Sequence, residues 1–225
     1  MNFSYVMTDW GKMYHLIEDN DSLLLTLSKK KVYQPYIINL ASQYGDKNII
    51  DIGANIGAHS IPIAKQNNNK VYAFEACSGN VSCLEKNKNY HQCDNLDIFP
   101  YALGSTKTSN IFYQVPTRRG ASSFDPTGLD MSTVVKKKVE CFPLDHFLSQ
   151  LEPVSFIKID VQNFEYQVLL GATQLIERDK PAILVECPGR NLYEQMTYQK
   201  ITHFFKKIGY YEKKRFNKDC LFCVY

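Results

Sequence analysis

The stretch Asn48-Ile-Ile-Asp-Ile-Gly-Ala-Asn-Ile-Gly57 decides which fold this chain can adopt. Its first part is short, β-branched and apolar, which is typical of a buried parallel strand. Asp51 begins a turn that carries two glycines, and Gly53 permits a close backbone approach or an unusual φ that a Cβ would block. An amphipathic run follows, so the pattern predicts a strand, a glycine turn and a helix whose free backbone N–H groups can hold a ligand.

The spacing of the glycines indicates which ligand this turn binds. A dinucleotide fingerprint G-x-G-x-x-G starting at Gly53 needs glycines at positions 55 and 58, where the chain has Asn55 and Ala58. The pyrophosphate-binding turn is therefore absent. The pattern D-x-G-x-N-x-G instead resembles the first motif of class I S-adenosylmethionine (SAM) methyltransferases, whose ligand offers a zwitterionic amino-acid end to backbone amides and a nearby carboxylate. An ordinary strand-to-helix connection is the alternative interpretation.

Strands and helices are predicted to alternate along most of the chain. Further strands are expected at 71–74, 96–99, 154–160, 182–186, 210–214 and 220–225. Helices are expected at 33–44, 56–66, 80–89, 145–151, 163–177 and 192–208, with a kink or a late start at Pro62. Segment 22–28 is predicted to be a strand or a short buried segment. The order favours a doubly wound α/β sheet with an antiparallel edge.

We expect one domain over residues 1–225, since this length fits a single α/β domain with a full core. Residues 1–32 are predicted to cap the sheet edge or the cofactor. Residues 108–142 are predicted to form an inserted β-hairpin with strands at 110–115 and 134–142 and a mobile polar loop between them. Loops at such a rim often carry substrate contacts.

Composition sets the broad class of the protein. A hydrophobic fraction of 44% and a charged fraction of 22% are ordinary for a globular chain, and a net charge of +3 is too slight to indicate nucleic acid. Seven scattered cysteines and no apolar opening segment predict reduced thiols and a cytoplasmic location. Cys220 and Cys223 are interpreted as thiols of a terminal strand, because no second pair completes a zinc site. No run approaches the length of a membrane span.

Two acidic residues end predicted strands at the edge where the glycine turn lies. Glu75 ends strand 71–74, a position from which a carboxylate can accept both hydroxyls of a ribose, although a surface glutamate would look the same. Asp160 ends strand 154–160 beside the same crevice, and a helix cap is its alternative role. Ala102 lies with Tyr101 and Leu103 at the rim, where apolar groups can flank an adenine.

Three segments together resemble the FkbM-type methyltransferase domain, over roughly residues 33–190. They are Asp51-Ile-Gly-Ala-Asn-Ile-Gly57, Phe74-Glu75, and Ile157-Lys-Ile-Asp-Val-Gln-Asn-Phe-Glu165 followed by Val168-Leu-Leu-Gly-Ala172. Family members are class I SAM-dependent methyltransferases that mostly O-methylate hydroxyls on sugars, lipids or polyketides. The resemblance implies a Rossmann-like, mostly parallel seven-stranded sheet with an antiparallel C-terminal strand.

The resemblance also implies roles for single residues. The methionine part of SAM is expected against Asp51, Gly53, Asn55 and Gly57, its ribose against Glu75, and the transferring methyl against Asp160 and Lys158. The family usually has Glu-Gly where this chain has Gln162-Asn163, and often Glu where Gln34 stands. The loss of two carboxylates leaves the catalytic arrangement open.

Methyl transfer from a sulfonium is an in-line displacement, and a hydroxyl acceptor needs a base within hydrogen-bond reach. We expect Asp160 to be that base or an orienting group, with Glu186 or Glu165 sharing the proton. Some small-molecule O-methyltransferases of this fold hold Mg²⁺ with acids at places resembling Asp160 and Glu186. Cys187 stands where a hard oxygen ligand would be needed, so we lean against a divalent metal and leave metal dependence open.

The sequence therefore predicts a SAM-dependent O-methyltransferase that transfers a methyl group to a hydroxyl of a saccharide or glycan, so its partner is a small-molecule or glycan acceptor. One alternative is an RNA methyltransferase, and another is a non-catalytic SAM-fold binding module, which Gln162 and Asn163 keep open. The RNA alternative rests on basic clusters at Lys29-Lys30-Lys31, Arg118-Arg119, Lys136-Lys137-Lys138 and Lys213-Lys214-Arg215. These are offset by 23 acidic residues and read as solvated faces, so we expect weak, salt-dependent RNA binding at most. The oligomeric state stays open.

Overall fold

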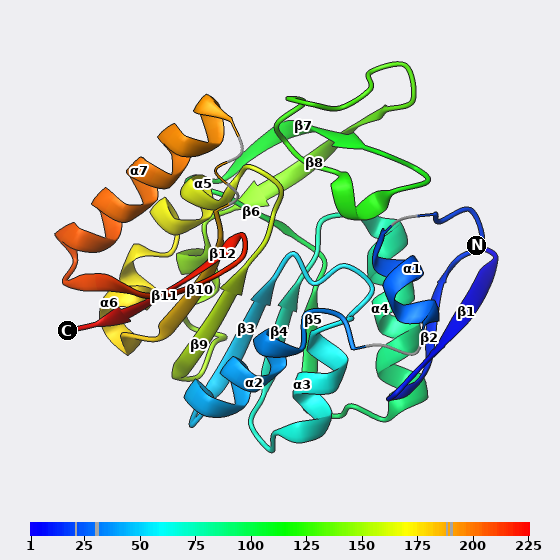
Figure 1. Cartoon of the computed structure of the whole chain (residues 1–225), viewed down its shortest axis with the longest axis horizontal. Coiled ribbons are helices and arrows are strands. Elements are labelled where there is room, and N and C mark those ends of the chain that lie inside the picture. The colour runs from blue at the N-terminus through cyan, green and yellow to red at the C-terminus, as the bar shows by residue number, and fades with distance from the viewer. Residues whose placement is uncertain (21, 30–31, 188, 190) are drawn as a thin grey trace.

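A seven-stranded sheet forms the centre of the computed structural model, which describes all residues except 21, 30–31, 188 and 190 (Figure 1). The strand order is β11-β12-β10-β9-β3-β4-β5. The strands are β3 (Asn48–Ile52), β4 (Val71–Phe74), β5 (Leu96–Phe99), β9 (Val154–Ile159), β10 (Ala182–Glu186), β11 (Tyr210–Phe216) and β12 (Asp219–Val224). The five strands from β10 to β5 are parallel, whereas β12 is antiparallel to both of its neighbours. The predicted doubly wound sheet with an antiparallel C-terminal strand is confirmed.

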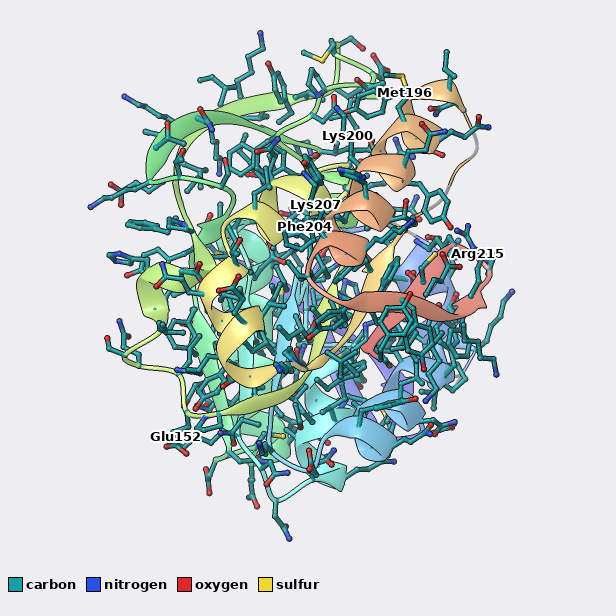
Figure 2. All side chains as sticks on the ribbon, turned by 90° about the vertical axis from the view of Figure 1, so that its left-hand side faces the viewer. Glu152, Met196, Lys200, Phe204, Lys207 and Arg215 are labelled. Carbon is teal, nitrogen blue, oxygen red and sulfur yellow. The ribbon has the colours of Figure 1, made fainter. Side chains whose placement is uncertain are left out.

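Helices cover both faces of this sheet. One face packs against α2 (Pro35–Tyr44), α3 (Ser60–Gln66) and α4 (Ser78–His91), and the other against α5 (Glu165–Leu170), α6 (Thr173–Asp179) and α7 (Leu192–Lys207). Side chains alternate between the two cores along each strand: Ile49 packs in the first core, and Ile50 and Ile52 pack in the second. The outer side of α7 carries Met196, Lys200 and Lys207 (Figure 2).

The strand order creates a crevice at one edge of the sheet. From β3 the chain proceeds outward through β4 to β5, and it later returns to pair β9 and β10 on the other side of β3. The carboxyl ends of these parallel strands all lie at one edge. Open α/β sheets bind ligands at such a switch point, where the winding direction reverses.

A second, small sheet lies beyond this edge. The strands β7 (Thr108–Gln114) and β8 (Val135–Phe142) form the expected hairpin, and β6 (Ala102–Leu103) pairs in parallel with β8. Between β7 and β8 the chain folds back on itself, because Tyr113 and Ser123 exchange backbone hydrogen bonds of 2.8 and 3.2 Å. A 3₁₀ helix, η1 (Arg119–Ala121), occupies this return.

The N-terminal region differs from the prediction. The strands β1 (Phe3–Thr8) and β2 (Gly11–Leu16) form an antiparallel hairpin that the sequence did not reveal. Segment Ser22–Ser28, expected as a strand or a short buried segment, is helix α1, so the strand alternative is wrong. Leu23, Leu24 and Leu27 are buried, whereas Leu25 is 59% exposed. The buried leucines therefore have the spacing of one helix face.

Two predicted helices also differ in extent. The continuous helix expected at 163–177 is broken into α5 and α6 at Gly171, where a Cβ would lie 2.0 Å from the carbonyl oxygen of Gly104. The helix expected at 145–151 is a 3₁₀ helix, η2 (Leu144–Phe147), followed by a turn. The helix expected from residue 56 begins late, at Ser60, as predicted from Pro62. Pro62 lies in the first turn of α3, where a backbone N–H has no partner within the helix, so its missing N–H costs no hydrogen bond.

The cysteines and the helix lengths bear on two further expectations. All seven cysteines are buried and unbridged, and Cys220 and Cys223 lie in the terminal strand β12 as expected. Across the part of the chain that the structure describes, no helix is both long enough and apolar enough to cross a bilayer.

Candidate active site

A cavity of about 370 Å³ opens at the carboxyl edge of the sheet, a size typical of small-molecule sites. It brings together six of the residues predicted from the sequence, from strands that are far apart along the chain. They are Gly53, Asn55, Glu75, Ala102, Lys158 and Asp160. The other four predicted residues lie outside its lining: Asp51, Gly57, Glu165 and Glu186.

Gly53 provides the close approach that the sequence pattern requires. Its φ is +77°, and a Cβ there would lie 1.9 Å from the carbonyl oxygen of Asp160. The amides of Gly53 and Ala54 both donate to the carbonyl oxygen of Phe74 at 3.0 Å. The glycine turn is thus held between the ends of β4 and β9, with no room for a side chain. Gly57 instead packs the turn against α4, since a Cβ there would lie 2.6 Å from Leu84 Cδ1.

Asp51 and Lys158 form a buried ion pair beneath the turn. Asp51 Oδ1 lies 2.9 Å from Lys158 Nζ, and Ser60 Oγ donates to Asp51 Oδ2 at 2.6 Å. Lys158 Nζ also donates to the carbonyl oxygen of Gly53 at 2.9 Å. Burial lowers the pKa of Lys158, but the carboxylates of Asp51 and Asp160 raise it above its usual value, so the ammonium stays charged. The pair ties β3, β9 and the glycine turn together.

Glu75 lies at the end of β4 with its carboxylate held by two backbone amides. Asn55 N donates to Oε2 at 2.7 Å, and Cys77 N donates to Oε1 at 2.8 Å. Burial raises the pKa of Glu75, and these two hydrogen bonds oppose that rise. A carboxylate oxygen has more than one acceptor site, so each oxygen can still accept a ligand hydroxyl.

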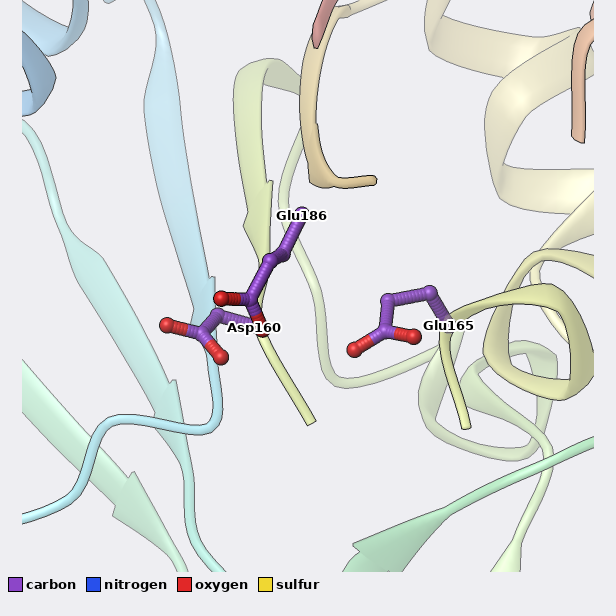
Figure 3. Close-up of side chains that lie close together, drawn as sticks. All are labelled: Asp160, Glu165 and Glu186. Carbon is purple, nitrogen blue, oxygen red and sulfur yellow. The ribbon is translucent and has the colours of Figure 1, made fainter. Parts of the chain in front are cut away.

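Three carboxyl groups lie close together at the cavity, where Asp160 belongs to the lining (Figure 3). Oxygens of Asp160, Glu165 and Glu186 lie within 4.8 Å of one another. Burial raises the pKa of Glu186, and the negative charge of Asp160 raises it further. Burial also acts to raise the pKa of Asp160, but the ammonium groups of Lys158 and Lys218 outweigh it and lower the pKa. Asp160 is therefore ionised and Glu186 neutral at neutral pH.

Gln162 and Asn163, which depart from the family pattern, have defined places in this cluster. Gln162 Nε2 donates to Asp160 Oδ1 at 2.7 Å and to Glu186 Oε2 at 2.9 Å. A glutamate there would add a fourth carboxyl group, whereas the amide supplies two N–H donors. Asn163 has φ +74°, a conformation that glycine adopts freely and asparagine tolerates. Asp160 does not cap α5, which begins at Glu165 after Phe164.

The carboxyl cluster is the place in the described residues where a cation could be held. Glu165 accepts a hydrogen bond from Val161 N at 3.0 Å, and burial, reinforced by the charge of Asp160, raises its pKa to about 7. Lys218 donates a hydrogen bond to Glu186, and Gln162 bridges Glu186 to Asp160. These N–H donors occupy oxygens that a metal ion would need.

Two polar residues of the lining, His59 and Lys218, were not predicted from the sequence. His59 precedes α3, is 5% exposed, and its Nε2 has no hydrogen-bond partner in the described part of the chain. Burial, with the charge of Lys158, lowers its pKa to about 4, so the imidazole is neutral. Lys218 lies in the turn between β11 and β12. Because β12 is antiparallel to β10, it begins at the carboxyl edge of the sheet, and the turn before it lies at that edge. The predicted topology contained this antiparallel strand but did not identify Lys218 as a residue of the site.

The outer wall of the cavity comes from the N-terminal segment and the β7–β8 hairpin. Arg119 is 4% exposed and pairs with Asp19 at 2.6 Å, and Asn20 N donates to the carbonyl oxygen of Thr117 at 2.7 Å. These contacts join the two segments. Three aromatic rings line the cavity beside this wall: Phe112 and Phe124 of the hairpin, and Phe164, which precedes α5. Their centroids lie 5.2 and 5.1 Å apart along this series.

The basic clusters at 118–119, 136–138 and 213–215 belong to different elements of the fold. Lys136–Lys138 are exposed on β8 and Lys213–Arg215 are exposed on β11, whereas Lys30 and Lys31 lie outside the described residues. Arg118 lines the cavity, and Arg119 is buried, so the solvated-face interpretation is wrong for Arg119. Among the described residues of these clusters, Arg118 and Arg119 line the cavity.

Comparison with known proteins supports these observations. The sequence model of the methyltransferase FkbM domain matches residues 51–211. The crystal structure of methyltransferase FkbM from Methylobacillus flagellatus KT superposes with a TM-score of 0.56 at 17% identity, covering 79% of this chain and 43% of that chain. This chain thus spans less than half the length of that protein. No curated protein sequence matches it significantly.

Two further structures share the fold over most of both chains. An O-methyltransferase from Bacillus cereus in complex with SAH has a TM-score of 0.53 at 16% identity, covering 87% of this chain and 83% of that one. The precorrin-6y C5,15-methyltransferase from Geobacter metallireducens GS-15 has a TM-score of 0.52 at 13% identity, covering 92% of each chain. At these identities the likeness establishes the fold.

Proposed function

Because the chain belongs to the methyltransferase FkbM domain family, we propose that it is a SAM-dependent O-methyltransferase acting on a hydroxyl of a saccharide or glycan. One observation carries the proposal: Gly53, Glu75 and Asp160 follow adjacent parallel strands and line one cavity at the switch point of the sheet. That arrangement offers a close backbone approach, a ribose acceptor and a catalytic carboxylate in a single row.

The cofactor fits the cavity along this row. Ala102 and Leu103, after β5, flank the place for the adenine, and Glu75 accepts the ribose hydroxyls. The left-handed turn at Gly53 packs against the carbonyl oxygen of Asp160, which places this backbone beside the sulfur end of the ligand. When bound, SAM supplies the methyl group as an activated sulfonium substituent.

The residues of the chain supply alignment and a place for the proton. The acceptor oxygen forms a bond to the methyl carbon as the carbon–sulfur bond breaks, and the sulfonium becomes the neutral sulfide of S-adenosylhomocysteine (SAH). The hydroxyl proton passes to the carboxylate of Asp160. Lys158, Lys218 and Gln162 hold that carboxylate ionised and oriented, so it is ready to accept a hydrogen bond from the hydroxyl.

The outer wall supports a saccharide acceptor. Phe112, Phe124 and Phe164 present apolar ring surface beside polar groups, a combination that suits the CH faces and hydroxyls of a sugar. An RNA acceptor would need a continuous basic surface for its phosphates. Arg118 and Arg119 are the members of the basic clusters that reach the cavity in the described chain, and Arg119 is neutralised by Asp19.

Transfer of labelled methyl groups tests the proposal. The protein would be incubated with methyl-labelled SAM and either a panel of mono- and oligosaccharides or a pool of RNA. We expect label in the saccharide fraction, carried by an alkali-stable ether. Label confined to RNA would favour the RNA alternative, and SAM binding without transfer to any acceptor would favour the non-catalytic module. Failure to bind SAM in calorimetry would contradict all three.

A further inference from the structure

The order of residues along the sheet edge predicts where the amino-acid end of the cofactor lies. From β5 to β12 the cavity is lined in turn by Ala102, Glu75, Gly53, Asp160 and Lys218. SAM is a linear molecule in which adenine, ribose, sulfonium and amino acid follow one another. With the ribose at Glu75, the amino acid extends over Gly53 toward β9, two strand spacings or about 10 Å away.

His59 is an unsatisfied polar group at this end of the cavity. It is 5% exposed, it lines the cavity, and its Nε2 has no hydrogen-bond partner among the described residues. A buried polar atom without a hydrogen-bond partner destabilises the folded chain. Its ring packs against Tyr33, with centroids 5.4 Å apart, so the imidazole is held in place. A ligand that bonds Nε2 would recover the lost interaction.

Lys218 and Tyr33 add donors to the same region. Both line the cavity, and the charge of Lys218 acts on His59 and on Tyr33. Lys218 donates to Glu186, and an ammonium group has three N–H donors, so others remain for a ligand. Tyr33 contributes a hydroxyl. One ammonium, one imidazole and one phenol together form a donor-rich subsite.

We propose that His59, Lys218 and Tyr33 bind the α-carboxylate of the methionine end of SAM. The inference rests on the proposed function. It replaces two expected contacts to that end: Asp51, whose carboxylate pairs with Lys158, and Gly57, whose backbone packs against Leu84. The turn of the C-terminal β11–β12 hairpin thereby becomes part of the cofactor site. A carboxylate suits this subsite because it accepts several hydrogen bonds and carries the charge opposite to Lys218.

Two ligands that differ in the amino-acid end test the proposal directly. SAH carries the α-carboxylate, whereas 5′-methylthioadenosine has the same adenosine and sulfur but lacks the amino acid. Calorimetry would give the dissociation constants of both ligands for the parent, His59→Phe, Lys218→Met and Tyr33→Phe. Glu75→Gln serves as the ribose control and should weaken both ligands alike. His203→Phe, at an exposed position of α7, controls for the ring change and should weaken neither.

We expect His59→Phe and Lys218→Met each to weaken SAH about tenfold or more, and to change 5′-methylthioadenosine less than twofold. Equal effects on the two ligands, or none, would overturn the proposal. If His59→Phe does not fold, Lys218→Met decides the matter, because that residue lies in a partly exposed turn. A parent that binds neither ligand would instead contradict the proposed function itself.

Discussion

Asp51 and Lys158 are direct neighbours across the parallel pair β3–β9, and Asp51 Oδ1 lies 2.9 Å from Lys158 Nζ with both side chains buried. The family resemblance places both residues against the cofactor. In the structure their charges face each other, and Ser60 and the carbonyl oxygen of Gly53 complete their hydrogen bonds. We infer that the pair shapes the glycine turn from beneath.

Removing one charge of this pair should destabilise the protein. Asp51→Asn leaves the Lys158 ammonium buried and without its closest counter-charge, which costs about 3–5 kcal/mol for buried pairs. Urea unfolding followed by circular dichroism would measure the loss. Glu152→Gln breaks the exposed pair Lys70–Glu152, of 2.6 Å, and should leave the unfolding midpoint unchanged. Equal midpoints for Asp51→Asn and the parent would mean that the pair does not support the fold.

Gly53 should tolerate no side chain. In Gly53→Ala the new methyl group would lie 1.9 Å from the carbonyl oxygen of Asp160, so the turn must move and SAH affinity should fall at least tenfold. Gly128→Ala is the matched control, because Gly128 also has a positive φ, +81°, but no atom lies within 4 Å of its Cβ position. Gly128→Ala should cost about 1–2 kcal/mol of stability and keep SAH affinity. Parental affinity in Gly53→Ala would show that the turn is not part of the site.

Stability should depend on pH through Glu165. Burial raises its pKa to about 7 in the folded chain, above an unfolded value of about 4.5, so its stabilising contribution is complete below pH 4.5 and is lost as the pH rises to 7. The loss is about 3 kcal/mol, since one pKa unit is worth about 1.4 kcal/mol. Glu165→Gln has no carboxyl group to ionise.

Unfolding free energies of the parent and of Glu165→Gln, measured from pH 4.5 to pH 8, would reveal this contribution. Relative to the parent, the variant should gain stability up to about pH 7 and then stay level. Glu186, whose pKa is also raised, titrates in both proteins, so the difference between them reports mainly on Glu165. Two parallel curves would contradict the assignment.

The sheet was predictable because its strands are short apolar runs bounded by turns. Asn48–Ile52 and Val154–Ile159 bury both faces, so their composition alone identifies them. The β1–β2 hairpin was missed because Phe3, Tyr5 and Met7 are apolar residues on the exposed side of β1, which removes the contrast between its two faces. The break at Gly171 depends on a contact with Gly104 that no local pattern contains.

The site was predictable to the extent that its residues end strands. Gly53, Glu75 and Asp160 follow β3, β4 and β9, and parallel pairing brings such positions to one edge. His59 and Lys218 depend on tertiary structure: the first is identified by its burial without a partner, and the second by the antiparallel turn that returns to the edge. Neither property is visible in residue type or spacing.

Asp160 should be needed for methyl transfer more than for folding. Asp160→Asn removes the carboxylate that receives the proton, and turnover should fall by roughly 10²–10⁴-fold. The fold should survive. The charge of Asp160 helps to raise the pKa of Glu186, so without that charge Glu186 can ionise beside Lys218, which already donates to it. Transfer from labelled SAM would give the rate, and Asp130→Asn, at an exposed carboxylate of the β7–β8 loop, should leave it unchanged.

The same assay decides the role of metal. Gln162 and Lys218 donate to Asp160 and Glu186, so the carboxyl cluster has internal partners, and we expect the parent to keep its activity in the presence of a chelator. Loss of activity with chelator and its return with Mg²⁺ or Mn²⁺ would show instead that Asp160, Glu165 and Glu186 hold a cation. If Asp160→Asn turns over at the parental rate, Asp160 takes no part in the chemistry, whatever the chelator does.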